Sequence, residues 1–117
     1  MRVLIADDNK LVRRGIAGIL SGEKDYEVCG EASDSIETFN KAGELTPDLI
    51  LLDVSMPGTN GLNTAQILRQ HFPALKILII SQHDPDQLLP RSLEAGAQGC
   101  IDKARLATAL LPTLRNL

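Results

Sequence analysis

Residues 49–58 read Leu49-Ile50-Leu51-Leu52-Asp53-Val54-Ser55-Met56-Pro57-Gly58, an unbroken apolar run that ends in a carboxylate and a Pro-Gly turn. A continuous apolar run of this length is typical of a strand that is covered on both faces of a parallel sheet. Burying the charge of Asp53 would cost several kcal/mol unless the carboxylate is paired or bound to a metal. We therefore expect a central strand that delivers Asp53 to the rim of a sheet, beside cationic groups.

The composition is that of one soluble globular domain: 117 residues, of which 44% are hydrophobic and 23% charged. The net charge of −3 argues against binding nucleic acid or an anionic membrane through bulk charge. Cys29 and Cys100 lack the spacing of a zinc site or a disulfide framework, which favours a reducing cytoplasm. The apolar start of the chain is too short for a signal peptide, and no run is long enough to span a membrane. We expect a cytoplasmic domain without membrane contact.

Strand-like and helix-like segments alternate along the chain. The expected strands are 3–6, 26–32, 48–54, 76–80 and 100–102, and the expected helices are 10–20, 33–45, 62–71, 85–95 and the segment after Lys103. Connections of a few residues between such segments are typical of right-handed βαβ crossovers. The pattern predicts an α/β fold with a doubly wound, five-stranded parallel sheet and five helices. Segment 26–32 alternates in polarity, so we expect it at an edge.

Helical spacing assigns apolar residues to one face of each helix. Leu11, Ile36 and Ile67 belong to these apolar faces, and in segment 62–71 the face is expected to be a buried stripe. The leucines of the last helix, Leu106, Leu110, Leu111 and Leu114, are expected to lie mainly in the core.

Capping residues and prolines mark the expected ends of several helices. Asp8 or Asn9 is expected to cap the first helix, and Asp84 the fourth. Pro90 lies inside the fourth helix, where it removes a backbone hydrogen bond at a cost of about 3 kcal/mol. We expect that helix to be kinked or short, and Pro112 to threaten the end of the last helix.

Polar residues follow four of the five expected strands. The first ends in Asp7-Asp8, the third in Asp53, the fourth in Ser81, and the fifth is followed by Lys103. In open parallel sheets, ligands bind outside the carboxyl ends of the strands. Three neighbouring carboxylates repel one another unless a cation neutralises them, and oxygen ligands suit Mg²⁺.

Together these groups predict phosphoryl chemistry. Three aspartates, one lysine and one Mg²⁺ make a neutral site, where an incoming phosphoryl group of charge about −2 would meet a metal, an ammonium and a hydroxyl donor. Phosphoryl transfer to a carboxylate needs such groups around an in-line nucleophile. Asp53 is the expected nucleophile, with Lys103 and Ser81 beside the phosphoryl oxygens.

The same residues make the chain closely similar to the receiver domain of two-component response regulators. The resemblance rests on Asp7-Asp8, the run from Asp53 to Gly58 with Gly61-Leu62, Ser81, the stretch Glu94-Ala95-Gly96-Ala97 with Gly99, and Lys103. The Met-Pro-Gly and Ala-Gly-Ala segments, with His83 two places after Ser81, look most like the NarL/FixJ subfamily.

The resemblance implies a flavodoxin-like, CheY-like sheet with strand order 2-1-3-4-5, and a receiver that occupies residues 1–117. Members of this subfamily usually control transcription through a helix-turn-helix domain, which would lie outside this chain and supply any DNA contact. A sensor histidine kinase is the implied partner, and homodimerisation on phosphorylation is left open. The domain would be a phosphoacceptor that promotes its own phosphorylation and dephosphorylation, and not an enzyme.

The resemblance also implies a role for each site residue. Asp53 would accept the phosphoryl group from a phosphohistidine, while Lys103 and Ser81 would contact its oxygens. Asp8, Asp53 and the backbone carbonyl of Ser55 would bind Mg²⁺, with Asp7 acting through a metal-bound water. Positions 55 and 83 would tune the lifetime of the acyl phosphate.

Two departures and three alternative functions accompany this interpretation. Cys100 stands where the family places a switch aromatic, so activation would rely on loop movement or be weak, and Pro90 lies in a helix of the usual output face.

One alternative is a stand-alone or degenerate receiver that binds partners without phosphorylation. A phosphatase of the haloacid dehalogenase type would need an acid where Ser55 stands, and in a flavin carrier Asp7 and Asp8 would repel the phosphate.

Overall fold

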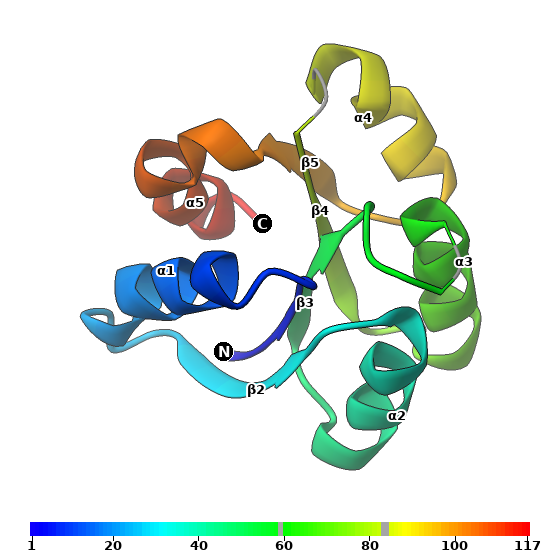
Figure 1. Ribbon diagram of the computed structural model, residues 1–117, viewed down its shortest axis with the longest axis horizontal. Helices are drawn as coiled ribbons and strands as arrows, with labels where there is room; N and C mark the ends of the chain where they lie inside the picture. Colours follow the sequence, from blue (N-terminus) through cyan, green and yellow to red (C-terminus); the bar gives the residue numbers. More distant parts are fainter. Residues whose placement is uncertain (59, 83–84) are drawn as a thin grey trace.

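A computed structural model describes residues 1–58, 60–82 and 85–117 of the chain (Figure 1). Within these residues strands and helices alternate in the expected order. They are β1 (Arg2–Ala6), α1 (Lys10–Ser21), β2 (Glu27–Ala32), α2 (Ser35–Leu45), β3 (Leu49–Asp53), α3 (Gly61–His71), β4 (Lys76–Ser81), α4 (Pro85–Glu94), β5 (Gly99–Asp102), a 3₁₀ turn η1 (Lys103–Arg105) and α5 (Leu106–Arg115).

The described strands form one parallel sheet in the order β2-β1-β3-β4-β5. Helices α1 and α5 lie on one face of the sheet, and α2, α3 and α4 lie on the other (Figure 1). This arrangement confirms the predicted doubly wound α/β fold with β2 at an edge. In the described part of the chain, none of the helices has the length and apolarity that a membrane crossing requires.

Strand β3 is the centre of the sheet, and all of its residues are buried. Leu49 and Leu51 pack into the core beneath α1 and α5, whereas Ile50 and Leu52 pack into the core on the opposite face. Because successive side chains of a strand point to opposite faces, a strand that is covered on both sides needs apolar residues at every position. The register pairs Asp53 with Ile80 of β4, which places the carboxylate at the carboxyl edge.

Side-chain caps fix the starts of α1 and α2. Asn9, one of the two candidates, caps α1, and its Oδ1 accepts hydrogen bonds from the amides of Leu11 at 2.9 Å and Val12 at 3.3 Å. Asp34 caps α2 by accepting the amide of Glu37 at 2.7 Å, so that helix begins after the expected position 33. The expected cap at Asp84 lies outside the described residues.

Three apolar residues assigned to helix faces are instead exposed. Leu11 is 75% exposed, Ile36 73% and Ile67 40%, so the predicted buried stripe of α3 is wrong at Ile67. Each helix touches the sheet along a stripe narrower than its full set of apolar residues, as α1 shows by burying Ile16 and Leu20. The surplus apolar side chains therefore face outward.

Neither internal proline ends its helix. Helix α4 continues past Pro90 to Glu94, and α5 continues past Pro112 to Arg115. In α5 the buried leucines at 106, 110 and 114 pack against the sheet. Tertiary packing supplies most of the stability of a short helix, so it outweighs the loss of one backbone hydrogen bond.

Candidate functional site

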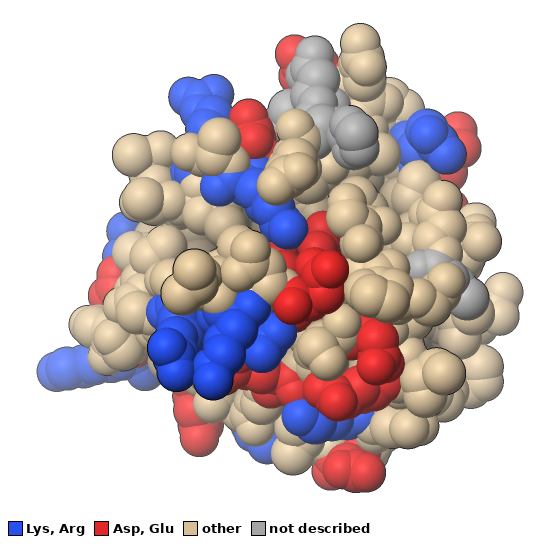
Figure 2. Space-filling model, in the orientation of Figure 1, with Lys and Arg blue, Asp and Glu red and all other residues tan. Residues whose placement is uncertain are grey.

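The polar residues predicted to act together meet at the carboxyl edge of the sheet. Asp7 directly follows β1, Asp53 ends β3, Ser81 ends β4 and Lys103 directly follows β5. Figure 2 shows acidic side chains gathered where β1 gives way to α1, with basic side chains over α1 beside them. The parallel sheet thus brings together groups that are far apart in the sequence.

Three carboxylates form the centre of the site. One oxygen from each of Asp7, Asp8 and Asp53 lies within 4.8 Å of the others. Asp7 and Asp53 are fully buried, whereas Asp8 is exposed. Such a cluster carries a charge of −3 when it is ionised, so it needs cations nearby.

Lys103 provides one of these cations. Its Nζ lies 2.9 Å from Oδ2 of Asp7 and 3.1 Å from Oδ2 of Asp53, and its side chain is 11% exposed. The two Oδ2 atoms have no further hydrogen-bond partner in the described structure. One ammonium therefore serves two buried carboxylates, and with Asp8 the cluster keeps a net charge of about −2.

Burial and charge shift two pKa values in the site. Burial raises the pKa of Asp53 and the neighbouring Asp7 raises it further, although the Ser55 amide at 3.0 Å and Lys103 act in the opposite direction. Burial alone would lower the pKa of Lys103, but its contacts with Asp7 and Asp53 outweigh that effect and raise it. Lys103 therefore stays charged at neutral pH, and a positive charge close to Asp53 favours its ionised form.

The loop after β3 is held by close backbone contacts. The amide of Val54 donates to the carbonyl of Ile80, and the amide of Gly61 donates to the carbonyl of Val54, both at 3.3 Å. A Cβ at position 61 would lie only 2.3 Å from the Cα of Val54, so the first residue of α3 has to be glycine. This contact fixes the loop that carries Ser55.

Asp7 is positioned by hydrogen bonds around the start of α1. Its Oδ1 accepts the amide of Asn9 at 2.8 Å, and its backbone carbonyl accepts Nη1 of Arg13 at 2.7 Å. Nε of Arg13 also donates to Glu31 at 2.8 Å. Arg13 was not predicted from the sequence, although its place one turn into the helix after the acidic pair is a signal that could have identified it.

An open polar hollow of about 550 Å³ gives access to the cluster. It is lined by Asp8, Asn9, Lys10, Ser55, Gln82 and Lys103. The sequence analysis singled out neither Lys10 nor Gln82, because their neighbourhood depends on the placement of α1 and β4. We name this hollow the polar basin.

The remaining predicted residues have different surroundings. Ser81 is fully buried at the end of β4. Cys100 is half-buried in β5 and packs against the core beneath α2, α3 and α4, and burial raises the pKa of its thiol despite a hydrogen bond with Ser92. Asp102 accepts the amide of Ala104 at 3.0 Å and so caps η1. His83 lies outside the described residues.

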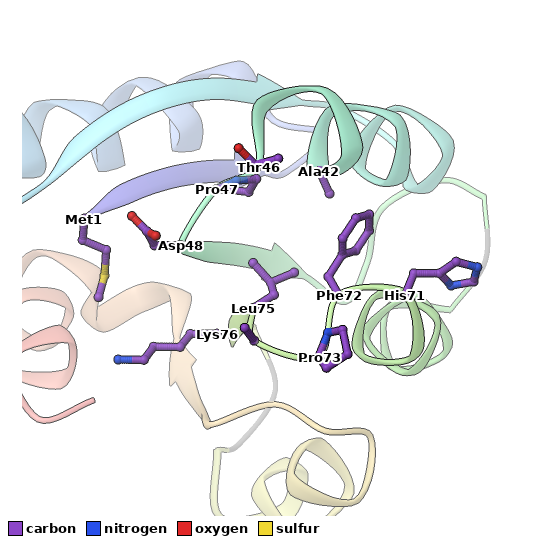
Figure 3. Close-up of a pocket in the computed structure, with 11 residues that line it drawn as sticks. Met1, Ala42, Thr46, Pro47, Asp48, His71, Phe72, Pro73, Leu75 and Lys76 are labelled. Atoms are coloured by element: carbon purple, nitrogen blue, oxygen red, sulfur yellow. The ribbon is translucent and has the colours of Figure 1, made fainter.

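A second hollow, of about 520 Å³, lies at the opposite edge of the sheet, beside the amino ends of the strands. Figure 3 shows Phe72 and Leu75 at its wall, with Asp48 and Lys76 as charged groups. The carboxylate of Asp48 already accepts the amide of Arg2 at 2.7 Å. The lining of this second hollow is mostly apolar and holds no cluster of acids. The polar basin is therefore the better candidate site.

The carboxylate cluster fits a hard divalent cation. Its ligand atoms are all oxygens, and its net charge of about −2 would be neutralised by one such ion. Mg²⁺ prefers this kind of donor set, with one or two carboxylates and the remaining positions filled by carbonyls and waters. Asp7, Asp8 and Asp53 are the residues that could hold it.

Comparisons with known proteins agree with this geometry. Residues 3–115 match the response regulator receiver domain family. The oxygen regulatory protein NreC of Staphylococcus epidermidis is 40% identical over 118 residues, which cover 100% of this chain and 54% of NreC. The chain thus spans about half the length of the curated relatives it matches.

Solved structures give the same result. The non-phosphorylated receiver domain of RcsB from Escherichia coli superposes with a TM-score of 0.91 at 30% identity, covering 98% of this chain and 90% of that one. A two-component response regulator of the LuxR family from Aurantimonas sp. SI85-9A1 gives a TM-score of 0.85 at 30% identity, covering 98% of this chain and 85% of that one. The chain belongs to the response regulator receiver domain family and, as the sequence resemblance indicated, to its NarL/LuxR-type members.

Proposed function

We propose that Asp53 accepts a phosphoryl group from the phosphohistidine of a sensor histidine kinase and that the phosphorylated domain then switches an output. The observation that carries this proposal is the 3.1 Å contact between buried Asp53 and Lys103, which itself lines the polar basin. A buried carboxylate with a raised pKa beside a fixed ammonium is suited to attack an electrophilic phosphorus.

The transfer balances as one bond made and one broken. An oxygen of Asp53 forms a bond to phosphorus while the P–N bond of the phosphohistidine breaks, and the imidazole leaves with the bonding electron pair and takes up a proton. Lys103, which contacts the Asp53 carboxylate at 3.1 Å, would exchange this contact for one with the phosphoryl oxygens. Ser81, at the neighbouring strand end, is proposed to donate a hydrogen bond to another phosphoryl oxygen.

Mg²⁺ is the proposed cofactor. Asp8, Asp53 and the backbone carbonyl of Ser55 would bind it directly, and Asp7 would act mainly through a metal-bound water. The bound ion would offset negative charge that accumulates when a phosphoryl group enters a site already carrying about −2.

The wider role is also a proposal, because the relatives are about twice as long as this chain. We propose a cytoplasmic phosphoacceptor that promotes its own phosphorylation and dephosphorylation, without external substrates. Its output would be transcription control, exerted on DNA by a helix-turn-helix domain outside this chain. Ser55 and His83 would tune the phosphoryl lifetime.

A degenerate receiver that acts by docking alone is the second candidate. Cys100 favours it, because a small thiol three residues before Lys103 offers no ring that could move on activation. The intact arrangement of Asp7, Asp53 and Lys103 favours phosphorylation instead.

A phosphorylation assay tests the proposal. The domain is incubated with Mg²⁺ and acetyl phosphate, and its intact mass is recorded. Wild type and the remote control Asp25→Asn should gain about 80 Da, the mass of one phosphoryl group. Asp53→Asn and a metal-free sample should gain nothing. Equal labelling of wild type and Asp53→Asn would contradict the assignment, and Mg²⁺ binding without any labelling would support docking alone.

A further inference from the structure

We propose that Lys10 is a phosphoryl-binding residue of the polar basin, which contacts the incoming phosphoryl group and helps to hold it after transfer. This inference rests on the proposed function, since it assigns a further residue to the same reaction. Lys10 is the first residue of α1 and lines the basin together with Asp8, Ser55 and Lys103. Its side chain is exposed to the solvent through which a donor would arrive.

The charge of the phosphorylated site calls for a second cation. Phosphorylation replaces the single charge of Asp53 with a group of about −2. Asp7 and Asp8 contribute two further negative charges, whereas Lys103 and one Mg²⁺ contribute three positive ones. The phosphorylated site would therefore keep one uncompensated negative charge, and the ammonium of Lys10 would neutralise it.

Lys10 is free to take this role, whereas its basic neighbour on α1 is not. Among the described residues, no carboxylate lies within ion-pair distance of Lys10. Arg13, by contrast, is held by Glu31 and by the carbonyl of Asp7. At the start of α1, Asn9 accepts the amides of Leu11 and Val12. An anion in the basin would therefore find the ammonium of Lys10 available for an ionic contact.

The position of Lys10 runs against the usual electrostatics of a helix. The amino end of a helix carries a partial positive charge, so a lysine is unfavourable there, and acidic residues are preferred in the first turn. The first turn of α1 contains no acidic residue. A residue that breaks a local rule without an evident structural gain often serves function. The gain here is a second basic residue, besides Lys103, in the lining of the polar basin.

The test compares Lys10→Gln, Lys10→Arg and the control Lys24→Gln, which removes the same charge from an exposed site in the α1–β2 loop. The second-order rate constant for labelling by acetyl phosphate is measured by intact mass. Lys10→Gln should lower it by about two- to fivefold, the usual strength of an exposed ionic contact. Lys10→Arg should restore most of the rate, and Lys24→Gln should match wild type. The difference should shrink at high ionic strength.

A binding measurement separates this inference from the proposed function. Beryllofluoride, a phosphoryl mimic used with a related receiver, is titrated calorimetrically into each protein in the presence of Mg²⁺. Lys10→Gln should bind it about two- to fivefold more weakly than wild type. Equal rates and equal binding for Lys10→Gln and wild type would overturn the role of Lys10 while leaving Asp53 as the acceptor. If wild type is not labelled, the proposed function fails, and the role of Lys10 stands only if beryllofluoride binding still weakens in Lys10→Gln.

Discussion

The Nζ atom of Lys103 lies 3.1 Å from Oδ2 of Asp53 although the two residues follow different strands, β5 and β3, and are far apart in the sequence. The same ammonium lies 2.9 Å from Asp7, so two buried carboxylates share one counter-charge. Negative charge therefore exceeds positive charge at the carboxyl edge of the sheet. Several measurable consequences depend on it.

Removal of Lys103 should destabilise the metal-free protein. In Lys103→Gln two buried carboxylates lose their ammonium, and breaking a buried pair in this way costs about 3 kcal/mol. Urea unfolding at neutral pH measures the loss. Mg²⁺ should recover part of it, because an ion that binds only the folded state stabilises that state. Lys24→Gln is the control, and an equal loss in both variants, or no recovery with Mg²⁺, would contradict the shared counter-charge.

The contribution of Lys103 should also fade at alkaline pH. Its contacts raise the pKa of the folded state above that of the unfolded chain. A raised lysine pKa contributes stability that is complete below the unfolded value of about 10.4 and is lost as the pH rises through the folded value. The difference in unfolding free energy between wild type and Lys103→Gln should therefore be constant near neutrality and shrink above about pH 10.

Asp53→Asn should stabilise the metal-free domain. Burial and Asp7 raise the pKa of Asp53, so the folded state binds the proton more tightly than the unfolded state does. The resulting penalty is absent below the unfolded pKa of about 3.9 and grows as the pH rises through the folded pKa. At pH 7 we expect Asp53→Asn to have a higher unfolding free energy than wild type, and this gain should disappear near pH 4. Asp25→Asn, an exposed control, should show no such trend in urea unfolding.

Gly61→Ala should distort the loop that carries Ser55. A Cβ would lie 2.3 Å from the Cα of Val54, so backbone has to move, and overpacking of this kind costs about 1–3 kcal/mol. Labelling by acetyl phosphate should slow in the same variant. Gly18→Ala is the matched control: it lies in open space on α1 and should gain about 0.5–1 kcal/mol. Similar stabilities for the two variants would argue against the close contact.

Both thiols should react slowly in the folded protein. Burial raises the pKa of Cys29 and of Cys100, which lowers the fraction of reactive thiolate at neutral pH. A thiol reagent at pH 7 should label the native domain much more slowly than the urea-unfolded chain, whose two cysteines should react at once. Fast labelling of Cys100 in the native state would contradict the expected burial of its thiol.

The fold could be predicted from the sequence because two simple patterns agree. The continuous apolar run before Asp53 indicates a strand buried on both faces, and short connections between alternating segments indicate parallel crossovers. The periodicity of apolar residues does not show how wide the contact between a helix and the sheet is. The exposure of Ile36 and Ile67 could therefore not be predicted from it. Helix α4 continues past Pro90 for four residues to Glu94, so this proline does not end the helix.

The candidate site was predictable as a set of strand ends, and less so in its supporting contacts. Asp7, Asp53 and Lys103 follow from the rule that parallel strands present their carboxyl ends at one edge. Arg13 forms an ion pair with Glu31, 18 positions away in the sequence, and this pairing depends on how α1 crosses the sheet. The need for glycine at 61 depends on the approach of Val54, which no local pattern encodes.

The site also has a temporal order, because its parts are far apart along the sequence. Asp7 is synthesised before Asp53, and Lys103 is synthesised after both. A nascent or prematurely terminated chain therefore holds the two acids without their ammonium and cannot bury them cheaply. Such a product would be left poorly folded and exposed to proteases, so an incomplete molecule would be removed before it could transmit a false signal.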